Sequence, residues 1–83
     1  MDSYDPYDCV EDVVKGIIGG NAYSVSMGVL EQRIEHLFPP EERENDAPAG
    51  LPDAMSLAGT FFLLHGWREV NEHHFSGYQK IDP

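Results

Sequence analysis

The stretch LPDAMSLAGTFFLL, residues 51–64, is the most apolar part of this 83-residue chain. Pro52 and Asp53 are typical of the first turn of a helix, and a glycine two residues after the stretch is typical of a helix end. We therefore predict a helix from about residue 52 to 65. A strand from Thr60 to Leu64 is the alternative, because a short apolar run cannot be assigned by its period alone.

Apolar side chains surround almost the whole circumference of this predicted helix. Its narrow polar stripe consists of Asp53, Ser56 and Thr60. A helix this apolar in so small a protein must be buried in the core or lie in a subunit interface. Because the side chains of Phe61 and Phe62 point about 100° apart, one small core would struggle to enclose both. We therefore expect self-association through one of them, which makes the chain a candidate homodimer.

Two further helices are expected before this stretch. The first runs from about 6 to 18, between a helix-opening Asp-Pro pair and a helix-ending pair of glycines. The second runs from about 25 to 38, between a capping serine, Ser24 or Ser26, and a pair of prolines. Their apolar faces hold Tyr7, Val10, Val14, Ile17, Met27, Leu30, Ile34, Leu37 and Phe38.

The remaining segments are polar. Residues 39–50, PPEERENDAPAG, have no apolar periodicity and predict an exposed acidic loop. In the tail, either 68–70 and 75–81 pair as a short hairpin across 71–74, or residues 68–74 extend the helical structure, and we favour an irregular or weakly β tail. The expected fold class is mainly α: residues 1–83 form a single small three-helix domain with a short irregular or β-hairpin C-terminal tail.

The charge of the chain bears most directly on its partners. Fifteen acids against five bases give a formal charge of −10. Such a field repels nucleic acid and anionic membranes and attracts basic surfaces over about 8 to 10 Å in cellular salt. A solvated face that only keeps the protein soluble is the alternative, but that role would not need so few bases. The expected partner-binding residues are Asp5, Asp8, Glu11, Asp12, Glu31, Glu35, Glu41, Glu42, Glu44 and Asp46.

The spacing of the first of these acids favours a particular kind of partner. Asp5, Asp8 and Asp12 rise about 4.5 and 6 Å apart along a helix, which resembles the spacing of phosphates along a nucleic-acid strand. The expected partner is therefore the basic surface of a nucleic-acid-binding protein. Direct DNA binding is excluded, because the second predicted helix offers only Arg33 to a phosphate backbone.

Metal binding and catalysis are not expected. Cys9, His36, His65, His73 and His74 lack the spacing that brings two ligands to one metal. Carboxylates near Cys9 would weaken its thiol as a nucleophile, and no GxSxG motif is present. We therefore expect no cofactor, no metal and no enzymatic activity.

The lone cysteine, the acidic N-terminus and the lack of a long apolar run predict a cytosolic protein without a signal peptide or membrane span. Small acidic chains of this build resemble in character, without a shared motif, the inhibitors that phages and mobile elements make against host defence or transcription machinery, including anti-CRISPR proteins. We expect such a protein-binding inhibitor. The alternatives are a homodimeric adaptor and an immunity or antitoxin protein against a basic nuclease.

Overall fold

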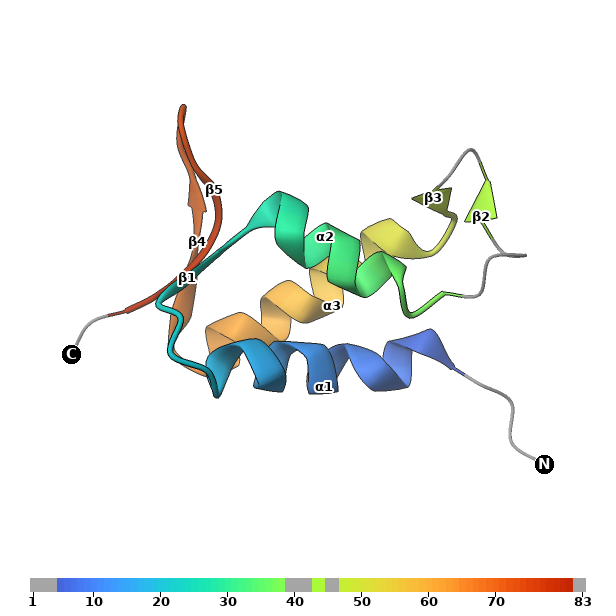
Figure 1. Ribbon diagram of the computed structural model, residues 1–83, viewed down its shortest axis with the longest axis horizontal. Helices are drawn as coiled ribbons and strands as arrows, with labels where there is room; N and C mark the ends of the chain where they lie inside the picture. The colour runs from blue at the N-terminus through green and yellow to red at the C-terminus, as the bar shows by residue number, and fades with distance from the viewer. Residues whose placement is uncertain (1–4, 39–42, 45–46, 82–83) are drawn as a thin grey trace.

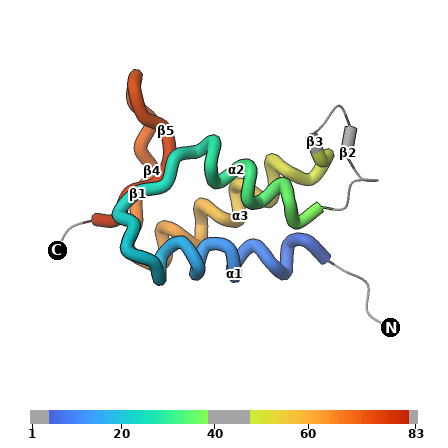
Figure 2. Tube along the Cα trace, in the orientation of Figure 1, coloured from blue at the N-terminus to red at the C-terminus, as the bar shows by residue number. Residues whose placement is uncertain are grey.

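The computed structural model describes residues 5–38, 43–44 and 47–81. Within these residues lie three helices, a three-stranded antiparallel sheet and a two-stranded one (Figure 1). The elements are α1 (Pro6–Ile18), β1 (Ser24–Ser26), α2 (Met27–Glu35), β2 (Arg43–Glu44), β3 (Ala47–Pro48), α3 (Leu51–Leu64), β4 (Trp67–Asn71) and β5 (Ser76–Lys80). The helices lie along the long axis, and the larger sheet stands across one end of them (Figures 1 and 2).

The expected mainly α, three-helix fold is wrong, because the chain is a mixed α/β domain. The tail is not irregular: β4 and β5 pair in register from Trp67 opposite Lys80 to Asn71 opposite Ser76, as in the hairpin alternative. β1 then adds to the other side of β5, which gives the strand order β1-β5-β4. β5 is thus the central strand, with a neighbouring strand on both sides at Gly77, Tyr78 and Gln79, which the sequence did not reveal.

The helices begin and end close to their expected positions, except for α2. The carboxylate of Asp5 caps α1 by accepting a hydrogen bond from the Tyr7 amide at 3.0 Å. α2 begins two residues late because Val25 and Ser26 belong to β1, and the Ser26 hydroxyl accepts from the Val29 amide at 3.2 Å. It ends three residues before the expected position, because the amides of Leu37 and Phe38 donate to the carbonyls three residues earlier in tighter turns. None of the helices in the described ranges combines the length and hydropathy that a bilayer crossing requires.

Residues 39–50 are not simply an exposed loop. They contain the short strands β2 and β3, and Pro48 is buried. The loop ends at Gly50, whose carbonyl accepts a hydrogen bond from the Tyr7 hydroxyl at 3.2 Å. This bond ties the start of α1 to the start of α3.

The core lies between the helices and the larger sheet. Its buried residues are Val10, Val14, Ile17, Val25, Leu30, Ile34, Phe38, Leu51, Ala54, Ala58, Phe62, Trp67 and Tyr78. The Tyr78 hydroxyl lies so close to Gly59 that a β-carbon there would overlap it. A β-carbon at Gly77 would overlap the Val25 carbonyl of β1. These two glycines let α3 and β1 approach β5.

Candidate functional site

α1 turns its carboxylates away from the core. Val10, Val14 and Ile17 are buried on one side of the helix. At 100° per residue, Asp8 and Asp12 fall on the opposite side, and both are exposed. With the exposed cap Asp5 and the half-buried Glu11, these residues form what we call the α1 acidic face. The structure thus brings together the first four of the expected partner-binding residues.

Few positive charges compensate this face. Lys15 Nζ lies 3.4 Å from Glu11 Oε2, one turn away, and the two side chains keep 57% and 45% of their solvent exposure. Asp5 caps the helix, and Asp8 lies in its first turn, where negative charge interacts favourably with the helix dipole. Asp12 has neither advantage and lies one turn after Asp8, a like-charge arrangement that destabilises helices by about 0.2 to 0.5 kcal/mol. Lys15, three residues after Asp12, carries the opposite charge and offsets this cost by a similar amount, so helix stability neither favours nor disfavours an acid at this position.

The acids of α2 lie on a different surface. Leu30 and Ile34 are the buried residues of this helix. Glu31 and Glu35 lie about 100° to one side of them, and Arg33 lies about 100° to the other. Glu31 is exposed and Glu35 is half-buried. These glutamates therefore do not lie on the same side of α2 as Arg33.

Most of the acids expected to bind a partner in residues 39–50 are not among the residues that the structure describes. Glu41, Glu42 and Asp46 lie outside the described residues, and Glu44 is part of β2. Their contribution to partner binding stays a prediction.

The potential metal ligands lie apart. Cys9 is half-buried on α1, whereas the four histidines, His36, His65, His73 and His74, are exposed. His74 Nε2 is 3.9 Å from Glu72 Oε1 on the same turn. Among residues 5–38, 43–44 and 47–81, no three His, Cys, Asp or Glu side chains cluster as a metal site would require. The expectation of a metal-free, non-catalytic protein stays a prediction.

The two phenylalanines proposed for self-association differ in burial. Phe62 has no exposed surface, because it packs between Trp67 and Tyr78. Phe61 is half-buried, and the next two residues, Leu63 and Leu64, are 59% and 75% exposed. Leu63 and Leu64 are adjacent in sequence and exposed, whereas Phe61 lies about 160° around the helix from Leu63. A subunit interface at the end of α3 would therefore be built from Leu63 and Leu64 rather than from Phe61 or Phe62.

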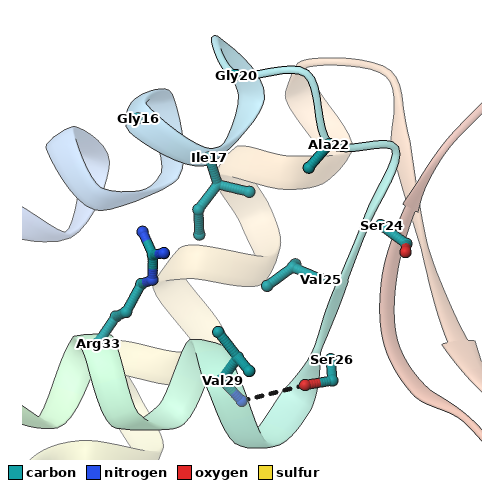
Figure 3. A pocket seen from close by; sticks show the side chains of 9 residues that line it. All are labelled: Gly16, Ile17, Gly20, Ala22, Ser24, Val25, Ser26, Val29 and Arg33. Carbon is teal, nitrogen blue, oxygen red and sulfur yellow. Dashed lines mark hydrogen bonds between the residues drawn. The ribbon is translucent and has the colours of Figure 1, made fainter.

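Two cavities were not predicted from the sequence. The first, of about 360 Å³, lies between the end of α1, β1 and α2, with Ile17, Val25 and Val29 directed into it and Arg33 at its side (Figure 3). The second has a similar volume and lies between α2, α3 and the hairpin, where Glu69 and Tyr78 contribute to its lining. The separation of Arg33 from the two α2 glutamates follows from helix geometry, but the first cavity depends on how α1, β1 and α2 pack together.

Comparison of the chain with protein-family models, with curated proteins and with solved structures gives no match. No residue role is therefore transferred from another protein. The α1 acidic face and the two cavities are the features from which a function can be inferred.

Proposed function

We propose that this protein binds a basic surface of another protein through the α1 acidic face, and that the basic surface is a nucleic-acid-binding site. The observation that carries the proposal is the exposure of Asp5, Asp8 and Asp12 on the outward side of a helix whose opposite side is buried. Because the core fixes α1, these carboxylates are presented in a rigid array. Binding would then cost little conformational entropy in the backbone.

The electrostatics of the whole chain support the same partner. A net charge of −10 accelerates the approach of a basic surface and repels nucleic acid itself. Asp8 and Asp12 are separated by about 6 Å along the helix axis, so they form a row of closely spaced negative charges, as the phosphates of a nucleic-acid strand do. A surface that binds phosphates can therefore accept these carboxylates in their place.

The biological role that follows is inhibition without catalysis. A protein that occupies a nucleic-acid-binding site prevents nucleic acid from entering it. We propose that the target is a host defence or transcription protein, that the inhibitor acts in the cytoplasm, and that a phage or mobile element encodes it. An immunity protein against a basic nuclease would use the same surface, and the identity of the target distinguishes the two roles.

The test begins with capture of partners by the tagged chain from a host lysate at about 50 mM and about 500 mM salt. We expect a basic protein that is retained at low salt and released at high salt. The purified partner is then bound to labelled nucleic acid and titrated with the chain. Displacement of the nucleic acid at one chain per site supports the proposal, and simultaneous binding of both contradicts it.

Exposed apolar side chains favour a second candidate, a homodimeric adaptor. Leu63 and Leu64 end α3, and the 53% exposed Ile81 lies beside them in the fold, because its amide donates to the Gly66 carbonyl at 3.0 Å. Burial of these three residues against a second copy would remove apolar surface from water. Sedimentation at about 100 μM tests this candidate: a monomer at that concentration excludes a dimer with a dissociation constant near 1 μM.

A further inference from the structure

The cavity between α1 and α2 combines an apolar interior with one positive charge. Ile17, Ala22, Val25 and Val29 line its interior, and Arg33 extends from α2 toward α1 along its side (Figure 3). Its volume of about 360 Å³ falls within the range of small-molecule sites. Such sites are mostly apolar and carry a few polar groups that orient the ligand.

Arg33 stands out among the basic residues whose side chains the structure describes. Lys15 is paired with Glu11, Arg68 donates to the Gln79 side chain at 3.4 Å, and Lys80 lies 5.7 Å from the centre of the Tyr23 ring. Arg33 has no ion-pair or hydrogen-bond acceptor among the described residues. Among the described residues, its guanidinium therefore keeps its five N–H donors without a protein acceptor, in a chain that carries an excess of acids.

We propose that this cavity binds a small monocarboxylate with an apolar body. The fork of the Arg33 guanidinium matches a carboxylate in two parallel hydrogen bonds, and the aliphatic side chains take up the apolar body. The site is separate from the α1 acidic face. A test that contradicts ligand binding in this cavity therefore leaves the proposed binding of a basic partner unaffected, and the reverse also holds.

The charges around the cavity select a single negative charge on the ligand. Arg33 is the one charged residue in the described lining of the cavity. Glu31 and Glu35 lie about 200° around α2 from Arg33, so they do not compete for its guanidinium. A ligand with several negative charges would meet one cation and be repelled by the net charge of −10. This excludes nucleotides and other polyanions as the expected class.

Sodium octanoate is a suitable probe of this site. We expect it to shift the backbone amide signals of residues 16–29 in a saturable nuclear magnetic resonance titration at millimolar concentrations. Octanol has the same apolar body without the charge, and we expect it to bind at least about tenfold more weakly. Hexanoate lacks two methylenes, and each methylene removed weakens binding by up to about fourfold.

Two matched pairs of variants test separately whether octanoate binding needs the charge of Arg33 and whether it needs the volume of the cavity. Arg33→Gln should weaken octanoate binding about tenfold or more, whereas Arg68→Gln, which removes the same charge on β4, should leave it within twofold. Gly16→Leu should fill the cavity and abolish binding, because a β-carbon at Gly16 meets no atom within 4 Å and Gly16 lies in its lining. Gly28→Leu is the control, since Gly28 is equally open but does not line the cavity.

Melting temperatures are measured for all four variants. We expect Gly16→Leu to melt no lower than the original protein, because the change replaces a helical glycine. The absence of saturable shifts with octanoate would overturn the proposal. Three other results would also overturn it. One is an equal loss of octanoate affinity in Arg33→Gln and Arg68→Gln. The others are octanol binding as tight as octanoate binding, and signal shifts confined to the residues of the second cavity.

Discussion

The rings of Phe62 and Tyr78 stack with their centroids 4.7 Å apart and an angle of 10° between their planes. Phe62 belongs to α3 and Tyr78 to β5, so this contact joins the helices to the sheet. Trp67, on the other strand of the hairpin, also contacts Phe62, with ring centroids 5.2 Å apart and an angle of 43° between the ring planes. The apolar helix is therefore central because it supplies the residue on which the sheet packs.

Replacement of Phe62 by alanine should remove most of the stability of the domain. The side chain is completely buried, and such truncations cost about 3 to 5 kcal/mol. Small domains have about 5 to 15 kcal/mol in total. Phe61→Ala, at a half-buried position, should cost clearly less. Chemical denaturation of both variants provides the comparison, and equal losses would contradict the central role of Phe62.

Stability should fall in alkaline solution because of Tyr78. Burial, and then the negative charge of Glu69, raise the pKa of Tyr78 above its ordinary value. The folded protein therefore holds the phenol proton more tightly than the unfolded chain, whose pKa is near 10. The contribution is complete below about pH 10 and is lost as the pH rises through the folded pKa.

Denaturation midpoints between about pH 8 and pH 11 test this dependence. The variant Tyr78→Phe should lose less stability over this range than the original protein. Tyr23→Phe serves as the control, because Tyr23 is 70% exposed and should leave the alkaline loss unchanged. The same alkaline loss in Tyr78→Phe as in the original protein would show that other groups cause it.

Two glycine-to-alanine changes should have opposite effects. At Gly77 the added β-carbon would overlap β1, and overpacking of this kind costs about 1 to 3 kcal/mol. At Gly16 it meets no atom within 4 Å, and alanine stabilises a helix interior by about 0.5 to 1 kcal/mol relative to glycine. Thermal melts should therefore shift down for Gly77→Ala and up for Gly16→Ala. A Gly77→Ala protein that melts like the original would mean that β1 does not pack closely on β5.

The helices were predictable because their signals are local. Asp5 and Pro6 open α1 and two glycines follow it, so its range agrees with the expected one. The hairpin of β4 and β5 was one of the two alternatives for the tail, but the three-stranded sheet was missed because the pairing of β1 is not local. β1 has three residues, too few to show a period, and it pairs with residues more than fifty positions later. In β4 the buried residues are Trp67 and Val70, which do not follow the alternation of a simple strand.

The candidate site was predictable to a similar extent. The outward direction of Asp8 and Asp12 follows from the apolar spacing of α1 alone. The separation of the α2 glutamates from Arg33 also follows from helix geometry. The cavity beside Arg33 does not, because it depends on how the end of α1, β1 and α2 pack together.

Asp12→Lys should weaken binding with little effect on stability. The new side chain gains an opposite charge at Asp8, one turn before it, and meets a like charge at Lys15, three residues after it, and these two effects of about 0.2 to 0.5 kcal/mol offset each other. The same change reverses one charge of the α1 acidic face. We expect a melting temperature close to that of the original protein, with weaker binding to the basic partner. A loss of both stability and binding would indicate that Asp12 has a structural role instead.

The most direct test of the account compares two double charge reversals in their affinity for the captured basic partner. Asp8→Lys/Asp12→Lys changes the α1 acidic face, and Glu69→Lys/Glu72→Lys changes exposed acids on and just after β4. Each pair adds four charges and so changes the formal charge from −10 to −6. We predict that the α1 pair weakens binding at least about tenfold more than the hairpin pair at the same salt concentration. Equal losses would mean that only net charge matters and would contradict a docking surface on α1.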